Sequence, residues 1–371
     1  MVNKDDTIQL FDLSSSVQIK NKYRAGLNKI LDESSFVLGD EVNSFEVNFS
    51  RFIGSKYSLG VNSGTDALEI CLRNLEIGAG DEVIVPSFSF FATSEVVLRV
   101  GAQPIYCDIN TTDLTMDIGH LENLITNKTK AIIPVHLFGN AANLSMIKRF
   151  TIGNSIKIIE DVAQAFGSKQ QSKYLGTIGH YGCFSFYPTK NLGGWGDGGL
   201  VSFQTKKHYD NLASLRNHGS KKSYFHEKVG LNSRLDSLQA LILNIKLIEI
   251  AKDLKMRVRN NSNLSEGLNK DTYKIHSQPN QPMNVFPITL KNESSTNKVK
   301  KLLKKNNISF GNYYPIGLHE FPISEFIQNK GEFKNTEIIK KTIITLPCHP
   351  KLNIAQIDKI VNILNLSLIH I

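Results

Sequence analysis

The chain has 371 residues, of which 41% are hydrophobic and 21% charged, a composition typical of a globular protein with one large core and a smaller second domain. Its four cysteines are far apart, its N-terminus has no apolar segment of signal-peptide length and no apolar run could span a membrane, so we expect a cytoplasmic protein with reduced cysteines and no membrane partner. The net charge of +9 does not indicate a nucleic-acid partner, because the densest basic stretch, residues 298–305, has the pattern of an amphipathic helix without base-stacking aromatics.

Short apolar segments alternate with helical patterns through residues 57–165. The apolar segments, rich in Val and Ile, are DEVIVP, QPIYCDI, TKAIIPVHLFG and SIKIIED. Helical patterns follow the first three, and GTDALEICLRNL, which precedes them, has an apolar stripe at helical spacing. Such alternation predicts βαβ units, and hence a mostly parallel sheet covered by helices on both faces.

The pattern changes in the C-terminal part of the chain. Two further helices are expected at residues 205–216 and about 234–266, the second long enough to link two domains. Beyond about residue 270, VFPITL, ISFGNYY and two helical stretches, residues 295–305 and 354–366, indicate a smaller α+β domain.

The segment GVNSGTDAL places Asn62, Ser63, Gly64 and Thr65 where a strand meets a helix N-terminus. In open α/β sheets, ligands bind at the carboxyl ends of the strands. Gly64 permits close backbone approach, and the first N–H groups of the helix favour a phosphate. An ordinary helix cap by Ser63 or Thr65 explains the same residues equally well.

Two more strand ends carry side chains that suit a ligand. Asp161 ends the strand of KIIED, where its carboxylate can face a positive group or cap a helix. Phe88, Phe90 and Phe91 crowd the strand end in PSFSFFATS, where they can stack on a ligand or pack in the core. Each signal is weak by itself.

Lys190 lies in FSFYPTKNLGGWGDGG, residues 184–199, between an aromatic strand and a glycine-rich turn. A surface lysine rarely has such neighbours. GWGDGG matches the dinucleotide fingerprint GxGxxG, but it lies late in the sheet region and is followed by LVSFQ, which has the pattern of a strand. A dinucleotide site needs a helix at that point, so we do not expect a nicotinamide cofactor.

A phosphate site, a carboxylate, an aromatic ring and a lysine after an apolar strand are together the parts that hold pyridoxal phosphate. The lysine amine forms a Schiff base with the aldehyde, and an apolar setting lowers its pKa so that neutral amine is available. The carboxylate keeps the pyridine nitrogen protonated, and the aromatic side chain stacks on the ring. The four signals therefore predict a pyridoxal-phosphate enzyme.

The ordered motifs SGTDAL, DEVIVPSFSFFAT, PVHLFG, EDVAQAFGS, FSFYPTKNLG–GDGG, GLNSRLDSLQA and YYPIGLH resemble the DegT/DnrJ/EryC1/StrS family of pyridoxal-phosphate sugar aminotransferases. The resemblance covers about residues 10–365. It implies an α/β fold of the fold-type I, aspartate aminotransferase-like class. We place the N-terminal arm and the large cofactor-binding domain in residues 1–250, and the small C-terminal α+β domain in residues 251–371.

The resemblance implies roles around the cofactor ring. Lys190 would be the Schiff-base lysine and the proton shuttle, and Asp161 would pair with the pyridine nitrogen. Gln164 would hydrogen-bond the ring hydroxyl, and Phe90 would stack on the ring. No metal is expected.

It also implies roles at the phosphate. Gly64, Thr65 and Ser185 would hold the phosphate within one subunit. Asn232 of GLNSR would reach it from the other subunit of a homodimer with shared active sites. Arg234 would meet an anionic group of donor or substrate.

Aromatic and histidine residues of the mobile or partner-facing segments match places where relatives contact substrate. The candidates are Tyr187, Tyr224, His226, Tyr313 and His319. A hinge or domain interface explains each of them as well. Trp195, the only tryptophan, shapes the sugar site or packs against the partner, and the sequence does not decide between these.

Transamination is the expected reaction, because family members that dehydrate sugars have histidine in place of Lys190. L-glutamate would give its amino group to the cofactor, which passes it to a keto group of a nucleotide-linked sugar by 1,3-proton transfer. SGTDAL and FYPTKNLG–GDGG resemble the enzymes acting at C-3′, which predicts a dTDP-linked 3-amino-3,6-dideoxyhexose as product. A C-4′ aminotransferase is the alternative. A non-catalytic protein of this fold would not need Lys190, Asp161 and Ser185 together. The product would serve a surface polysaccharide such as O-antigen, or antibiotic glycosylation.

Overall fold

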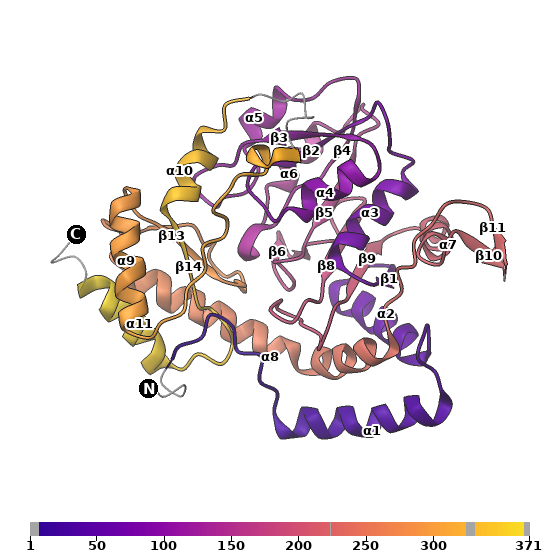
Figure 1. The fold of residues 1–371 in the computed structure, drawn as a ribbon, viewed down its shortest axis with the longest axis horizontal. Coiled ribbons are helices and arrows are strands. Elements are labelled where there is room, and N and C mark those ends of the chain that lie inside the picture. Colours follow the sequence, from indigo (N-terminus) through magenta and orange to yellow (C-terminus); the bar gives the residue numbers. More distant parts are fainter. Residues whose placement is uncertain (1–6, 223, 324–330, 367–371) are drawn as a thin grey trace.

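Seven strands form one sheet in the computed structural model, which describes residues 7–222, 224–323 and 331–366 (Figure 1). Their order is β1 (Tyr57–Val61), β9 (Gly199–Phe203), β8 (Tyr181–Ser185), β5 (Lys157–Asp161), β4 (Thr129–Ile132), β2 (Glu82–Pro86) and β3 (Gln103–Cys107). From β3 to β8 all neighbours are parallel, whereas β9 is antiparallel to both β8 and β1. The predicted mostly parallel sheet is therefore confirmed, with β9 as its reversed strand.

Helices cover both faces of this sheet. The first face packs against α3 (Gly64–Asn74), α4 (Ala92–Arg99) and α7 (Lys206–Leu215). The second face packs against α2 (Asp40–Ile53), α5 (Ile118–Glu122), α6 (Leu144–Arg149) and part of α8 (Ser237–Gly267). Strand residues alternate between these two cores: Val83 and Val85 of β2 lie in the first, and Ile84 lies in the second. This alternation is why the strands are apolar at nearly every position.

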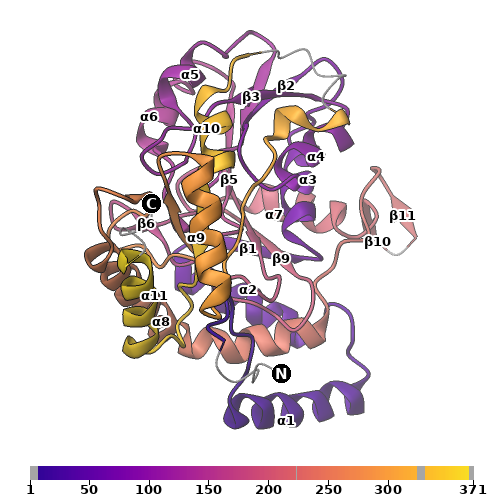
Figure 2. The same ribbon diagram turned by 60° about the vertical axis from the view of Figure 1, so that its left-hand side comes forward.

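A smaller antiparallel sheet lies near the C-terminal end of α8. It contains β12 (Lys274–Ile275), β13 (Phe286–Thr289) and β14 (Ile343–Leu346) (Figure 1). The helices α9 (Glu293–Lys305), α10 (Lys334–Thr342) and α11 (Ile354–Leu366) belong to the same part of the chain (Figure 2). The 31-residue α8 joins the two parts, with Leu243 in the core of the large sheet and Leu264 in the C-terminal core. The boundary predicted at residue 250 falls inside this helix and stays a prediction.

The helices expected at residues 205–216, 234–266, 295–305 and 354–366 correspond to α7, α8, α9 and α11. ISFGNYY forms no strand of the described chain; Ile308 and Gly311 make isolated bridges. The structure adds elements that the patterns did not predict. These are α1 (Val17–Glu33), α2, α10, β12, β14, the hairpins β6 (Lys169–Gln170)–β7 (Lys173–Tyr174) and β10 (Ser220–Lys222)–β11 (Phe225–His226), and the short helices η2 (Leu137–Gly139) and η3 (Leu318–Glu320).

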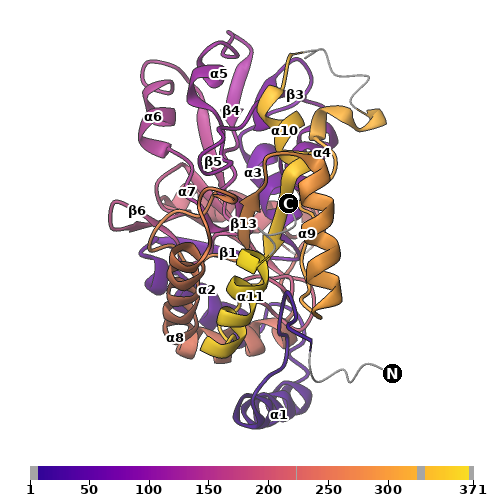
Figure 3. The same ribbon diagram turned by 90° about the vertical axis from the view of Figure 1, so that its left-hand side faces the viewer.

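The N-terminal helix α1 lies outside the main body (Figure 3) and runs along α8 (Figure 1). None of the helices in the described residues is long and apolar enough to cross a membrane. The cysteines of the described chain are buried thiols: Cys71, Cys107, Cys183 and Cys348.

Candidate active site

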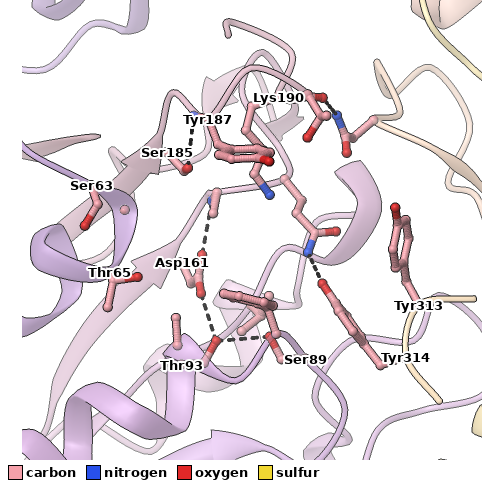
Figure 4. Close-up of a pocket in the computed structure, with 18 of the residues that line it drawn as sticks. Ser63, Thr65, Ser89, Thr93, Asp161, Ser185, Tyr187, Lys190, Tyr313 and Tyr314 are labelled. Carbon is pink, nitrogen blue, oxygen red and sulfur yellow. Dashed lines mark hydrogen bonds between the residues drawn. The ribbon is translucent and has the colours of Figure 1, made fainter. Parts of the chain in front are cut away.

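A cavity of about 750 Å³ opens at the carboxyl ends of β5 and β8 (Figure 4). This volume is typical of small-molecule sites. Most of the predicted site residues line it: Gly64, Thr65, Phe90, Asp161, Gln164, Ser185, Tyr187, Lys190 and Tyr313. The C-terminal part contributes further walls, including Asn284 and Tyr314, so the cavity lies between the two parts of the chain.

Lys190 follows β8 and points into the cavity (Figure 4). Its backbone N–H donates to the Tyr187 carbonyl at 2.9 Å, which closes a tight turn. The C-terminal part of the chain stabilises this turn, because the Asn284 side-chain amide donates a hydrogen bond to the Thr189 carbonyl at 2.9 Å. Burial lowers the pKa of the Lys190 ammonium to about 8, against the opposing effect of the Asp161 carboxylate. Neutral amine is therefore available near physiological pH.

Asp161 ends β5 with its carboxylate buried and turned toward the cavity. One oxygen accepts the Ala163 N–H and the other accepts the Thr93 hydroxyl, each at 3.1 Å. Burial raises the pKa of Asp161, whereas these hydrogen bonds and the Lys190 charge lower it. Both donors are neutral and leave the negative charge of the carboxylate in place. Its remaining lone pairs can therefore still accept a hydrogen bond from a cationic group in the cavity.

The first turn of α3 approaches the end of β8 closely. A Cβ on Gly64 would lie 2.7 Å from the Ser185 Cβ, so only glycine allows this approach. Ser63 caps the helix by accepting the Asp66 N–H at 3.0 Å, which confirms the capping interpretation. The N–H groups at the start of a helix have no backbone partner within it, and here Gly64 and Thr65 of the first turn line the cavity together with Ser185. This corner can hold a phosphate.

The three phenylalanines of PSFSFFATS have different surroundings. Phe88 is 1% exposed in the C-terminal core, and Phe91 packs on Phe321 with ring centroids 5.1 Å apart. Phe90 is 59% exposed and lines the cavity. Core packing thus explains two of the rings, and only Phe90 is free to cover a ligand ring.

Gln164 is fixed on both sides. Its Oε1 accepts the Phe138 N–H at 3.2 Å, and its Nε2 donates to the Tyr314 hydroxyl at 2.8 Å. The second hydrogen on Nε2 remains available for an oxygen of a ligand.

Asn232 and Arg234 do not line the cavity of their own chain. Arg234 donates to the Asn217 side chain at 2.8 Å. Between them, the Ser233 hydroxyl donates to the Asp66 carboxylate at 2.7 Å, which ties this loop to the start of α3. Their predicted contacts with a partner subunit stay predictions.

Three predicted substrate residues also lie outside the cavity of their own chain. Tyr224 is 99% exposed, and His226 bonds the His218 carbonyl in a hairpin that projects from the body (Figure 1). His319 lies 3.2 Å from a Glu337 oxygen and packs on the Phe333 ring.

The sequence did not single out several lining residues. Thr93 and Ser89 lie in a motif that drew attention for its aromatics, so their hydroxyls could have been noticed. Phe11 and Asn284 had no such signal, because neither has a recognisable local pattern. Both reach the cavity through contacts of the C-terminal part: Phe11 packs on that core, and Asn284 precedes β13.

The GWGDGG stretch lies in the connection from β8 to the antiparallel β9, and a strand rather than a helix directly follows it. It therefore lacks the helix N-terminus of a dinucleotide site. Trp195 packs on Tyr23 of α1, with ring centroids 4.6 Å apart, and does not line the cavity. Trp195 is 39% exposed, so packing against a partner subunit stays a prediction.

Comparison with known proteins shows similarity over almost the whole chain. The sequence model of the DegT/DnrJ/EryC1/StrS aminotransferase family matches residues 17–365. The UDP-N-acetyl-3-dehydro-alpha-D-glucosamine 3-aminotransferase of Acidithiobacillus ferrooxidans is 36% identical, covering 99% of this chain and 100% of the relative. The dTDP-3-amino-3,6-dideoxy-alpha-D-galactopyranose transaminase of Aneurinibacillus thermoaerophilus is 32% identical, covering 94% and 96%. The crystal structure of NtdA from Bacillus subtilis with bound cofactor PMP superposes with a TM-score of 0.90 at 26% identity, covering 100% of this chain and 87% of that one.

Proposed function

Because the chain belongs to the DegT/DnrJ/EryC1/StrS aminotransferase family, we propose that it moves an amino group from L-glutamate to the 3-keto group of a nucleotide-linked sugar, using pyridoxal phosphate. The observation that carries this proposal is the pairing of Lys190 and Asp161 in one cavity, with the α3 N-terminus beside them. An amine of lowered pKa, a buried carboxylate and an anion site match the aldehyde, the ring nitrogen and the phosphate of this cofactor.

The chain's own groups have separable tasks. Bound pyridoxal phosphate supplies an exchangeable carbonyl and a ring that withdraws electrons from the reacting carbon. Lys190 Nζ would move the proton between the substrate carbon and the cofactor carbon, which requires a neutral amine and fits a pKa of about 8. Asp161 holds a proton on the ring nitrogen, and Gln164 orients the ring through its free amide hydrogen.

Amination at C-3′ is supported by the names of both relatives, which describe 3-aminotransferases or 3-amino products. One of these relatives is named for a UDP sugar and the other for a dTDP sugar, so we propose either nucleotide as carrier. The runner-up is amination at C-4′. Asp66, whose motif suggested C-3′, bonds Ser233 outside the cavity, so any link to the sugar carbon is indirect.

We propose further that the enzyme is a homodimer in the cytoplasm whose Asn232 and Arg234 complete the partner's site, and that its product enters a surface polysaccharide. The support is the position of these two residues away from their own cavity, and the buried thiols expected of a reducing compartment.

The test follows the cofactor spectrum of the purified protein. Glutamate alone should convert the absorption band of the lysine-bound cofactor to that of the amine form. A UDP- or dTDP-linked 3-keto sugar should then restore the band, and the 4-keto isomer should not. Borohydride reduction before glutamate should label Lys190, identified by peptide mapping. The matched control, Lys190→Arg, keeps the positive charge but should give neither label nor exchange.

Restoration by the 4-keto sugar alone would transfer the proposal to C-4′. A label on another lysine would contradict the site assignment itself.

A further inference from the structure

Two hydroxyl groups lie in series behind the Asp161 carboxylate. Thr93 Oγ1 is 3.1 Å from Asp161 Oδ2, and Ser89 Oγ is 3.0 Å from Thr93 Oγ1 (Figure 4). Thr93 is 1% and Ser89 3% exposed, so both contacts are buried. Removing any member would leave a buried polar atom of its neighbour without this partner.

The direction of these hydrogen bonds follows from the number of hydrogens. An ionised carboxylate can only accept, and a hydroxyl has a single hydrogen to give. Thr93 therefore donates to Asp161 and must accept from Ser89. Both hydroxyl dipoles then point toward the carboxylate and favour its charged form.

The series also fixes how the carboxylate is turned. The terminal torsion of aspartate is broad, so a carboxylate without partners can rotate. The Ala163 N–H holds one oxygen and Thr93 the other, which leaves the remaining lone pairs of the carboxylate for the cavity. The nearby His136 does not share this task, because its imidazole is turned to Glu160, 3.1 Å away.

The same short segment supplies a second contact to the cavity. Phe90 lies between Ser89 and Thr93, and its carbonyl accepts the Thr93 N–H at 3.2 Å as α4 begins. Shifting this turn would therefore move the exposed ring and the hydroxyl series together.

We propose that Thr93, supported by Ser89, is a positioning residue that keeps Asp161 ionised and aimed at the ring nitrogen of the cofactor. The inference rests on the proposed function, since it presupposes pyridoxal phosphate in the cavity.

The experiment is equilibrium binding of two compounds to the cofactor-free protein, followed by absorbance. One compound is pyridoxal phosphate, and the other is its analogue with carbon in place of the ring nitrogen. Thr93→Val, which keeps the shape but loses the hydroxyl, should raise the Kd of pyridoxal phosphate about tenfold. The Kd of the analogue should change by less than about twofold, because the contact that Thr93 supports is absent there. Thr93→Ser, which keeps the hydroxyl, should restore most of the affinity for pyridoxal phosphate.

Equal losses with both compounds would overturn the inference, since Thr93 would then act only through packing. No loss with pyridoxal phosphate would overturn it as well. If Thr93→Val does not fold, Ser89→Ala carries the same comparison, with an expected loss of about threefold for pyridoxal phosphate alone. Failure of the unmodified protein to bind pyridoxal phosphate would remove the proposed function together with this inference, whereas the other failures leave the proposed function intact.

Discussion

The Lys190 amine of the cofactor-free enzyme is expected to titrate near pH 8, against an ordinary value of 10.5. At pH 7 a lysine of pKa about 8 is neutral in about one molecule in ten, and one of pKa 10.5 in about one in 3,000. Burial therefore raises the supply of reactive amine by about 300-fold at this pH.

The assay is reductive methylation of Lys190 by formaldehyde, with free N-acetyl-lysine amide in the same tube as the reference. The Lys190 rate, from mass spectrometry of its peptide, is divided by the rate per neutral molecule of the reference amine, which cancels the pH dependence of the reagents. The rate at Lys190 should reach half of its plateau near pH 8. In Asp161→Asn the midpoint should move to lower pH, because the carboxylate raises the pKa of Lys190.

Lys246 provides a matched comparison within the chain. Burial also lowers its pKa to about 8, but its ammonium donates to the Gly193 carbonyl and lies outside the cavity. Formaldehyde should therefore reveal Lys246 as well as Lys190 as a lysine of low pKa, whereas pyridoxal phosphate should label Lys190 and not Lys246. A midpoint for Lys190 above about pH 9.5, or an upward shift in Asp161→Asn, would refute the reasoning.

The remaining predictions concern the phosphate corner, the core and the cavity wall. Gly64→Ala should raise the Kd of pyridoxal phosphate about tenfold in a binding titration, because the new Cβ meets Ser185 at 2.7 Å; unchanged affinity would contradict the close approach. Arg216→Leu should lower the free energy of unfolding, measured in urea, by about 3–5 kcal/mol. The Arg216 guanidinium lies 2.6 Å from the buried Glu46 carboxylate, which the substitution would leave without its ion pair. Adding Glu46→Leu should recover part of the lost stability, and a further loss would be inconsistent with this cause. Phe11 lines the cavity and is expected to contact the nucleotide sugar. Phe11→Ala should therefore raise the KM of the nucleotide sugar about three- to tenfold, while glutamate converts the cofactor at an unchanged rate. Equal effects on both measurements would argue against a contact specific to the sugar.

Local patterns were sufficient to predict the large sheet and the centre of the site. The alternation of β2, β4 and β5 with helices follows from strands buried on both faces, and the structure confirms it. Lys190 and Asp161 could be identified because each ends a strand or follows one, and parallel strands bring their carboxyl ends to a single edge. Gly64 carried its own signal, since its neighbours in SGTDAL already indicated a helix start.

The elements that were missed include α1 and β14. α1 has exposed side chains along most of its length, and β14 directly follows α10 without a turn signal. ISFGNYY has strand-forming residues but only makes bridges, because its partners are decided by distant segments such as the N-terminal arm at Ile8 and the end of β14. Propensity cannot reveal such partners.

Local sequence patterns were enough to indicate the chemistry: a lysine, a carboxylate and a helix start in the order and setting that pyridoxal phosphate requires. Which side chains share the cavity, and how they are held, depends instead on contacts between distant segments. Thr93 meets Asp161 across 68 positions of the chain, and Asn284 reaches the Lys190 turn across 95. The same packing places Asn232, Tyr224 and His319 outside their own cavity. Local sequence specifies the direction of the backbone and the burial of each face, whereas contacts between distant segments depend on how the whole core packs.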